Sequence, residues 1–263
     1  MKIEFYKYHG TGNDFIIIDN RTLQWKPGQQ QVSLLCNRHF GIGSDGLMLL
    51  SEMKGFDFGM TYFNSDGNES TMCGNGGRCM AAFAKLLGII DDKTRFHAID
   101  GEHEAIMVNE LNQPEKIRLK MKDVVVEEPT CGYFFIDSGS PHTIIFSNNV
   151  NRLDIIRKAR KIRYDTCFAE EGTNVNFVEI KNDHLFVRSY ERGVEDETLS
   201  CGTGITASAL AAALKNPDNP GFYNIKTRGG DLKVSFRQEK NVFSDIWLVG
   251  PAEMVFKGVI EIY

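Results

Sequence analysis

The chain resembles itself when it is shifted by 128 residues. In this register Cys73 meets Cys201, and the residues that follow each cysteine coincide. The other matches are Gly74 with Gly202, Gly76 with Gly204, Asn64 with Arg192, residues 13–19 with 141–147, and residues 46–51 with 174–179. Three separated blocks match in order at one offset, which indicates an internal repeat. The period is too long for a solenoid, so the repeat indicates a duplicated domain. Two copies would form a pseudo-twofold pair, and we expect a ligand site in the cleft between them.

Strand-like segments occur through both halves of the sequence and are rich in β-branched and aromatic residues. They span residues 15–19, 46–51, 57–64, 116–122, 133–139, 143–147, 174–180, 184–190, 232–236 and 245–250. Each half also contains a helix that starts just after a cysteine, and the second is apolar nearly all round from Ala207 to Leu214. Such a helix is buried on every side. The pattern predicts an α+β fold of two similar domains, each with a mixed, mostly antiparallel sheet wrapped around a central helix.

The domain boundary is expected near residue 122. Residues 112–116 and 124–132 are the two stretches that have the composition of a linker. We expect an N-terminal domain over 1–122, to which 252–263 return, and a C-terminal domain over 123–251. In the second domain, Ile155, Ile156, Ala159 and Ile162 recur on one side of a helix predicted over 151–163.

Composition excludes several classes of protein. A net charge of -5 argues against nucleic acid as a partner, because neutralising phosphates requires a basic surface. No apolar run is long enough to span a membrane, and the N-terminus lacks the apolar core of a secretory signal. These features predict a cytoplasmic protein with no membrane partner. Six cysteines in 263 residues do not suggest a disulfide framework. The cysteines outside the repeat, which are Cys36, Cys79, Cys131 and Cys167, are expected to be structural thiols.

The two remaining cysteines, Cys73 and Cys201, each stand where a helix begins. A helix start carries unpaired backbone N–H groups and a positive dipole end, which favour a bound carboxylate and lower the pKa of a nearby thiol. If both helix starts held one amino-acid carboxylate, a sulfur would stand on each face of the α-carbon. A thiolate could remove the α-proton and a thiol could return one to the opposite face. This chemistry needs no cofactor, and no Cys-x-x-C or His-x-x-x-His spacing suggests a metal.

Six blocks carry a family resemblance through nearly the whole chain. They are "HGTGNDFIIID" (9–19), "NRHFGIGSDG" (37–46), "YFNSDGNESTMCGNGGRC" (62–79), "GSPHTIIF" (139–146), "EGTNVNFVE" (171–179) and "SYERGVEDETLSCGTG" (189–204). In these blocks the sequence closely resembles the diaminopimelate epimerases. These PLP-independent enzymes interconvert LL- and meso-diaminopimelate for lysine and peptidoglycan synthesis. The pair of Cys-Gly blocks is shared with relatives of proline racemase.

The resemblance implies roles for particular residues. Cys73 and Cys201 would be the two bases, with His142 near one thiol and Glu191 near the other. Backbone N–H groups of Gly74, Asn75, Gly202 and Thr203 would hold the reacting carboxylate. The residues that match the positions reading the distal end of the substrate are Asn13, Asn64, Asn174 and Arg192. Taken singly, His142 could be a structural histidine, Glu191 and Arg192 could be surface charges, and Asn13 and Asn64 could be turn residues.

Three features differ from the commoner family pattern. Ser140 stands where many relatives have asparagine, Gly46 stands where some have glutamine, and the loop after Tyr190 is one residue longer. Two other interpretations remain open at this stage: a racemase of proline or hydroxyproline on the same fold, and a duplicated binding module whose thiols are structural. The expected partner is a small-molecule substrate, and a homodimer is an assembly to be tested.

Overall fold

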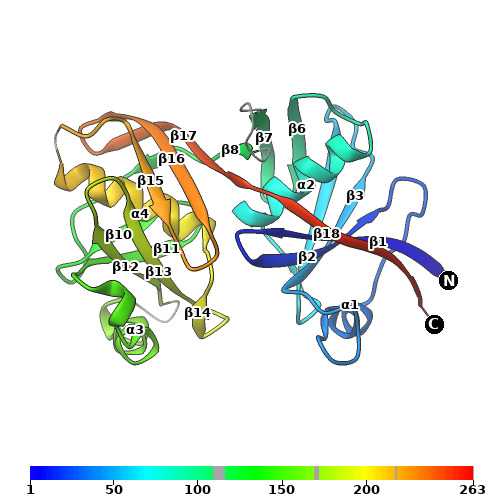
Figure 1. Ribbon diagram of the computed structural model, residues 1–263, viewed down its shortest axis with the longest axis horizontal. Helices are drawn as coiled ribbons and strands as arrows, with labels where there is room; N and C mark the ends of the chain where they lie inside the picture. Colours follow the sequence, from blue (N-terminus) through cyan, green and yellow to red (C-terminus); the bar gives the residue numbers. More distant parts are fainter. Residues whose placement is uncertain (109–115, 169–171, 217, 263) are drawn as a thin grey trace. The chain divides into compact units, whose positions relative to one another are not determined.

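The computed structural model describes residues 1–108, 116–168, 172–216 and 218–262, so residues 112–115 of one candidate boundary lie outside the described residues. The chain forms two compact units (Figure 1). Unit 1 comprises Met1–Leu119 and Gly250–Tyr263, and unit 2 comprises Lys120–Val249. Among the described residues, no helix combines the length and apolar character that crossing a membrane requires.

Unit 1 is built mainly of strands, with a long helix, α2, directly after Cys73. Its elements are β1 (Lys2–Gly10), β2 (Asn13–Asp19), α1 (Gln29–Cys36), β3 (Gly46–Ser51), β4 (Phe58–Asn64), β5 (Glu69–Ser70), α2 (Gly74–Leu86), β6 (Lys93–Ala98), β7 (Gly101–Val108), most of β8 (Lys116–Lys120), and β18 (Glu253–Glu261). The return of β18 to pair antiparallel with β1 brings the C-terminal segment into this unit.

Unit 2 repeats this plan, and its long helix, α4, directly follows Cys201. Its elements are β9 (Val124–Val125), β10 (Phe134–Asp137), β11 (Pro141–Phe146), η1 (Val150–Arg152), α3 (Ile155–Arg163), η2 (Thr166–Phe168), β12 (Asn174–Ile180), β13 (Leu185–Glu191), β14 (Asp196–Thr198), α4 (Gly202–Lys215), β15 (Phe222–Lys226), β16 (Asp231–Glu239), and most of β17 (Val242–Pro251).

Strand pairing follows the same order in the two units. In unit 1, β2 pairs antiparallel with β1 and parallel with β3, β3 pairs antiparallel with β4, and β4 pairs parallel with β6. In unit 2, β11 pairs antiparallel with β10 and parallel with β12, β12 pairs antiparallel with β13, and β13 pairs parallel with β15. The shared topology confirms the prediction of two similar domains with mixed, mostly antiparallel pairing.

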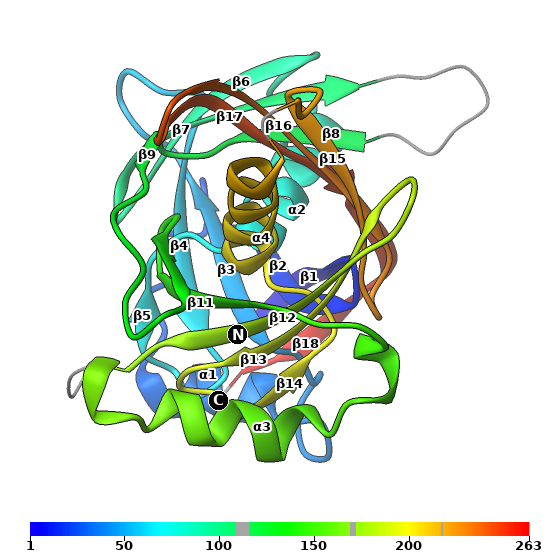
Figure 2. The ribbon, with the colours of Figure 1, turned by 90° about the vertical axis from the view of Figure 1, so that its left-hand side faces the viewer.

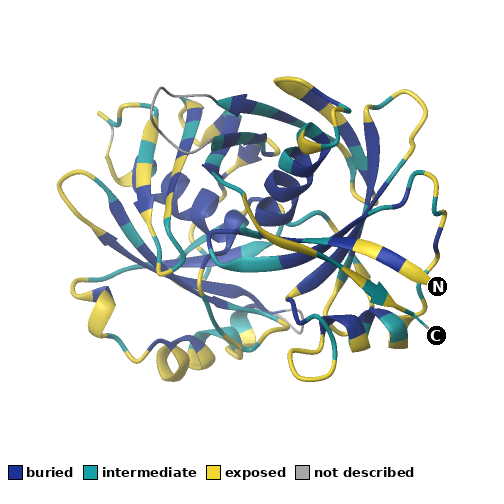
Figure 3. Ribbon diagram, turned by 45° about the vertical axis from the view of Figure 1, so that its right-hand side comes forward, coloured by how far each residue is buried: buried dark blue, intermediate teal, exposed yellow. Residues whose placement is uncertain are grey.

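The long helix of each unit packs inside its own strands. Helix α2 contacts β1, β2, β3 and β7, and α4 contacts β10 to β13 together with β15 and β16 (Figure 2). Met80, Phe83 and Ala84 of α2 are buried, and α4 is buried from Ile205 to Ala213. Buried residues concentrate in these helices and the inner strands (Figure 3). Gly88, with a positive φ of 67°, follows the end of α2, and glycine adopts this left-handed conformation without strain.

The repeat is not a single uninterrupted offset. In unit 1, Tyr62 of β4 pairs with Ser70 of β5, and in unit 2, Ser189 of β13 pairs with Thr198 of β14. Ser70 and Thr198 are 128 residues apart, whereas Tyr62 and Ser189 are 127 apart. The additional residue of unit 2 therefore lies in the turn between β13 and β14.

This shift corrects one equivalence drawn from the sequence. Counted along the paired strands, Asn64 corresponds to Glu191, the last residue of β13, and not to Arg192. The prediction that Asn64 and Arg192 are equivalent is wrong, because comparing sequences without a gap cannot place an insertion inside a turn. Arg192 instead begins the longer loop that follows β13.

The helix predicted over 151–163 begins later than its apolar pattern suggests. A 3₁₀ turn at Val150–Arg152 precedes it, and α3 itself spans Ile155–Arg163. Asp154 is the N-cap, and its carboxylate accepts a hydrogen bond from Arg157 N at 3.2 Å. An N-cap side chain that accepts a backbone N–H stabilises a helix start, so the helix begins after Asp154 and does not extend to Asn151.

The prediction for Cys131 and Cys167 is wrong. These residues form a disulfide with a Cα–Cα distance of 6.4 Å, whereas Cys36, Cys73, Cys79 and Cys201 carry thiols. Cys131 lies in the loop before β10 and Cys167 in η2. The fold brings together two segments separated by 36 residues, and sequence spacing alone does not reveal such a pairing.

Candidate functional site

Cys73 occupies the N-cap of α2. Its extended backbone, with φ -90° and ψ 134°, precedes the first helical residue, and Gly77 N donates to its carbonyl oxygen at 2.7 Å. The first backbone N–H groups of a helix have no intrahelical acceptor, so those at Gly74 and Asn75 are suited to an anion. The thiol is half-buried and lies beside these groups. Residues predicted to act together are therefore adjacent in unit 1.

Asn13 links the strand layer of unit 1 to this helix start. Its Oδ1 lies 3.5 Å from Cys73 Sγ and accepts from Asn75 Nδ2 at 3.3 Å. Its Nδ2 donates to Asp45 Oδ2 at 2.7 Å. The structure thus joins two of the predicted binding residues, Asn13 and Asn75, to Cys73.

Cys201 is the N-cap of α4 and starts the equivalent cluster in unit 2. Its sulfur is 3.5 Å from Thr203 Oγ1, which in turn is 2.8 Å from His142 Nε2. His142 is completely buried, and this burial lowers the pKa of its imidazole to about 3. A neutral imidazole therefore contacts Cys201 through the Thr203 hydroxyl.

The second nitrogen of His142 is also engaged. His142 Nδ1 lies 2.9 Å from Asn176 Nδ2, and Asn176 Oδ1 accepts from Ser189 Oγ at 2.7 Å. A Cβ on Gly204 would lie 2.4 Å from Asn176 Oδ1, so glycine is required where the helix meets this cluster. Because both ring nitrogens have partners, His142 is held in one position beneath the helix start.

Asn174 is buried and holds two loops of unit 2 together. Its Nδ2 donates to Ser140 Oγ at 3.0 Å and to Pro141 O at 2.9 Å, while its Oδ1 accepts from Arg192 N at 2.8 Å. The side chain predicted to contact substrate therefore fixes the backbone of Arg192. Ser140, one of the departures from the family pattern, has an acceptor role in this arrangement.

Glu195 anchors the longer loop that carries Arg192. Its carboxylate accepts hydrogen bonds from Arg163, Tyr164 Oη, Tyr190 Oη and Gly193 N at 2.8–3.2 Å. Burial alone would raise the pKa of Glu195, but these donors and the Arg163 charge outweigh it and lower the pKa to about 2. The carboxylate is consequently ionised at neutral pH, and the loop is tied to the end of α3.

Glu191 and Asn64 hold corresponding places at the ends of β13 and β4. The Glu191 carboxylate accepts a hydrogen bond from Thr198 Oγ1, close in sequence to Cys201. Asn64 is exposed, and its backbone pairs with Asn68 and Gly67 in the β4–β5 turn. Their predicted contacts with a ligand remain predictions.

Position 46, at the start of β3, has no room for a side chain longer than that of glycine. A Cβ at this position would lie 2.5 Å from the Tyr62 ring and 2.6 Å from Phe63 O. Tyr62 is buried and occupies the space that a side chain at position 46 would need.

We call the polar clusters around Cys73 and Cys201 the two half-sites. Several polar residues in them were not predicted from the sequence. They are Asp45 and Arg78 in unit 1, and Asn176, Ser189 and Glu195 in unit 2. No sequence pattern marked Arg78, because it lies on the side of α2 away from the apolar positions Met80, Phe83 and Ala84. It is fully buried, and the loss of hydration lowers the pKa of its guanidinium.

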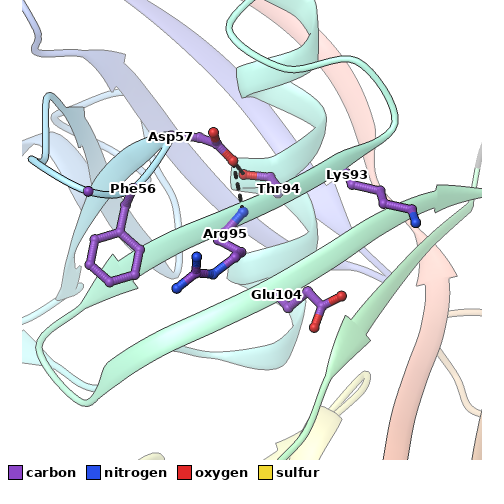
Figure 4. Close-up of a pocket in the computed structure, with 7 residues that line it drawn as sticks. Phe56, Asp57, Lys93, Thr94, Arg95 and Glu104 are labelled. Atoms are coloured by element: carbon purple, nitrogen blue, oxygen red, sulfur yellow. Dashed lines mark hydrogen bonds between the residues drawn. The ribbon is translucent and has the colours of Figure 1, made fainter.

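A surface pocket of unit 1 lies elsewhere, between the β6–β7 hairpin and the loop before β4 (Figure 4). Its seven lining residues, all within the described part of the chain, include none of the predicted site residues. Asp57 accepts hydrogen bonds there from Thr94 Oγ1 at 2.9 Å and Arg95 N at 2.8 Å. Arg95 also pairs with Glu102 and lies over the Phe56 ring. Asp57 and Arg95 therefore already have partners within the protein.

Comparison with known proteins identifies a family. The family model described as "Diaminopimelate epimerase" matches residues 5–126 and again 134–255. A diaminopimelate epimerase of Flavobacterium psychrophilum is 50% identical over 261 residues, which cover 98% of this chain and 100% of that protein. The two matches to one model agree with the duplicated topology.

Solved structures with the same fold are more distant in sequence. A PhzF-family phenazine biosynthesis protein of Bacillus anthracis has a TM-score of 0.74 at 13% identity, covering 100% of both chains. A hydroxyproline epimerase from Agrobacterium vitis, with bound trans-4-OH-L-proline, has a TM-score of 0.69 at 14% identity, covering 98% of this chain and 92% of that one. At such identities the similarity establishes the fold alone.

Proposed function

The chain belongs to the diaminopimelate epimerase family, and from this premise we propose that it interconverts LL- and meso-2,6-diaminopimelate without a cofactor. The observation that carries the proposal is the duplicated half-site: Cys73 and Cys201 are both helix N-caps, each beside its own hydrogen-bonded polar cluster. A single thiol serves one face of a stereocentre, whereas inversion needs a proton donor and an acceptor on opposite faces.

In the proposed mechanism, one thiolate removes the α-proton while the other cysteine, as a thiol, delivers a proton to the opposite face. The N–H groups at the starts of α2 and α4 stabilise the negative charge that develops on the carboxylate. His142, held neutral by burial, positions the Thr203 hydroxyl beside Cys201 and takes no proton itself. In the reverse direction the two sulfurs exchange roles.

We propose that both units contribute to a single site, because one α-carbon must meet both sulfurs. The proposed domains are 1–122 with 252–263, and 123–251. Gly74, Asn75, Gly202 and Thr203 hold the reacting carboxylate in this scheme. The proposed contacts to the distal end come from Asn13, Asn64, Asn174, Glu191 and Arg192, with Asn174 acting at least partly through the Arg192 backbone.

Solvent deuterium exchange tests this function directly. When the protein is incubated with LL-diaminopimelate in D₂O, we expect deuterium at the α-carbon and growth of the meso isomer, both followed by NMR. Proline and hydroxyproline, which lack the distal amino-acid end, should exchange far more slowly. Exchange of proline at a comparable rate would favour the racemase alternative. No exchange with any of the three would favour a binding module.

We also propose that the protein works in the cytoplasm, supplying precursor for lysine and peptidoglycan. The two proposed bases must stay reduced to work, and a reducing compartment keeps cysteines as thiols. A reducing cytoplasm does not account for the Cys131–Cys167 disulfide.

A homodimer formed through β18 is a further part of the proposal. This strand pairs with β1 and exposes Val255 and Val259 at 56% and 63%. Met254 and Phe256 are also about half exposed, so one strand presents a run of apolar side chains. Strand edges with exposed apolar residues favour association, and a second copy offers a matching apolar strand.

Sedimentation equilibrium should therefore give twice the 29.7 kDa chain mass for the wild type, and a single chain mass for Val259→Lys. Val125→Lys is the matched control, because Val125 on β9 is also 63% exposed and should leave the dimer intact. A monomeric wild type, or a Val259→Lys protein that remains dimeric, contradicts this assembly.

A further inference from the structure

The side chains around Cys73 form a hydrogen-bonded chain that has a charge at each end. Arg78 Nη2 donates to Asn75 Oδ1 at 2.8 Å, Asn75 Nδ2 donates to Asn13 Oδ1 at 3.3 Å, and Asn13 Nδ2 donates to Asp45 Oδ2 at 2.7 Å. The chain thus runs from α2, through the start of β2, to the residue that precedes β3.

The two ends determine the direction of every bond between them. A guanidinium can only donate and an ionised carboxylate can only accept, whereas an amide can turn either way. With Arg78 at one end and Asp45 at the other, a single orientation of both amides satisfies the chain. That orientation turns the Asn13 oxygen, and not its nitrogen, toward Cys73.

Both ends are held in place. Arg78 is fully buried and also donates to Gly74 O at 3.1 Å and Pro251 O at 3.4 Å. Asp45 accepts from Arg38 Nη2 at 2.8 Å and from Asp14 N at 3.2 Å. The 2.7 Å bond from Asn13 to Asp45 is charge-assisted and shorter than the 3.3 Å bond to Asn75, so Asp45 dominates the orientation of Asn13.

The second half-site has no such fixed direction. Thr203 Oγ1 can donate to or accept from Cys201 Sγ, and the chain through His142 and Asn176 ends at the Ser189 hydroxyl, which also serves either way. Reversing this second chain needs the His142 ring to change tautomer and the Asn176 amide to turn, and neither end carries a charge that forbids these changes. The chain at Cys73 cannot reverse.

We infer that Asp45 is a positioning residue for Cys73. It holds the Asn13 amide so that Oδ1 accepts the S–H hydrogen bond, which stabilises the thiol form and directs its proton. The geometry itself does not depend on the proposed function. Its consequence for proton delivery does.

Charges near Cys73 must be separated from this hydrogen-bond effect. Arg78, on the same helix, favours the thiolate, whereas the Cys79 thiol is uncharged because burial raises its pKa. Asp45, behind Asn13, carries a negative charge that disfavours the thiolate through space. Arg38 contacts that carboxylate, and the more distant Asp14 is paired with both Arg38 and Lys7. A test must therefore remove the charge of Asp45 while keeping its ability to accept.

The test is the pH profile of iodoacetamide alkylation at Cys73, quantified by mass spectrometry of its peptide. Cys201 in the same sample is the internal reference. Asn13→Leu removes the acceptor, so Cys73 should alkylate about three- to tenfold faster at pH 7, with a lower profile midpoint. If the amide nitrogen faced the sulfur, the same substitution would slow alkylation. The sign of the change thus decides the orientation.

Two substitutions at Asp45 separate position from charge. Asp45→Ala frees the amide and should speed alkylation in the same direction as Asn13→Leu. Asp45→Asn keeps an acceptor for Asn13 and should stay within about twofold of wild type, because Arg38 is 57% exposed and can move aside. In an Asn13→Leu background, only the through-space effect of the charge remains, so Asp45→Ala should change the rate by no more than about twofold, as Asp45→Asn does alone. Equal acceleration by Asp45→Ala and Asp45→Asn, or an effect of Asp45→Ala in that background as large as its effect alone, would overturn the inference.

Kinetics then distinguish this inference from the proposed function. Asp45→Ala should lower kcat for diaminopimelate several-fold with little change in KM, and Asp45→Asn should restore most of it. If wild-type protein exchanges no α-proton but alkylation follows the predicted order, the function fails while the positioning role holds. If the enzyme is active but Cys73 alkylation is unchanged in all variants, the positioning role fails while the function holds.

Discussion

Cys73→Ala and Cys201→Ala are each expected to lower kcat for epimerisation by about 10³-fold or more, because positioned acid–base groups typically contribute 10²- to 10⁴-fold. Either substitution removes one of two proton-transfer groups, and the remaining sulfur reaches only one face of the α-carbon. Neither should disturb the fold, since each cysteine is a helix N-cap whose side chain makes no capping hydrogen bond. The measurement is NMR of isomer conversion, beside a thermal unfolding curve.

Cys36→Ala is the matched control for this experiment. Cys36 is the last residue of α1 and is 3% exposed in the core of unit 1, and its sulfur accepts a hydrogen bond from Ser44 Oγ at 3.3 Å. Its substitution should lower the melting temperature and leave kcat unchanged. Turnover by Cys73→Ala or Cys201→Ala within tenfold of wild type would show that a single base suffices.

Arg192→Ala is expected to lower kcat/KM for diaminopimelate by about 30-fold or more. Loss of one partner of a buried charged hydrogen bond costs roughly 2–5 kcal/mol, and 2 kcal/mol corresponds to about 30-fold. The motivation is the loop itself, because Asn174 fixes the Arg192 backbone and Glu195 ties the loop to α3. Part of the loss should appear in kcat, since distal binding aligns the α-carbon between the sulfurs. Steady-state kinetics with a melting curve measures both effects.

Glu195→Ala provides a second variant of the same loop. It leaves the Arg192 side chain in place but removes its anchor, so we expect a smaller loss that falls mainly on KM. The folded-state pKa of about 2 lies below the ordinary value of 4.5, so the anchor is fully present above pH 4.5 and weakens as the pH falls toward 2.

If Arg192→Ala stayed within threefold of wild type, Arg192 would be a surface residue, and the preference for diaminopimelate over smaller amino acids would lose its support.

Local sequence patterns predicted the fold class and many of the elements, but they missed the strands β1, β6, β7, β15 and β18. Strand segments, the helix starts at Cys73 and Cys201, and the apolar character of α4 depend on neighbours within a few residues, and the structure confirms them. The family resemblance also rests on local blocks, and the comparisons confirm it. Where an element boundary depended on one side chain, as at the Asp154 cap of α3, the apolar period alone was misleading.

Contacts between distant segments were decided only by the tertiary structure. The pairing of Cys131 with Cys167 and the single-residue shift that places Glu191 opposite Asn64 in the repeat could not be read from spacing.

The sequence by itself determined that this protein has two thiols at two helix starts. The residues that start each helix lie next to its cysteine in the chain, and the repeat makes the two cysteines equivalent. Only the tertiary structure decided how those thiols differ. Cys73 faces an amide fixed between Arg78 and Asp45, whereas Cys201 faces a hydroxyl that can reverse. The physical reason is that a hydrogen bond's direction depends on which donors and acceptors meet in space, and in unit 1 these come from β2, the segment before β3, and α2.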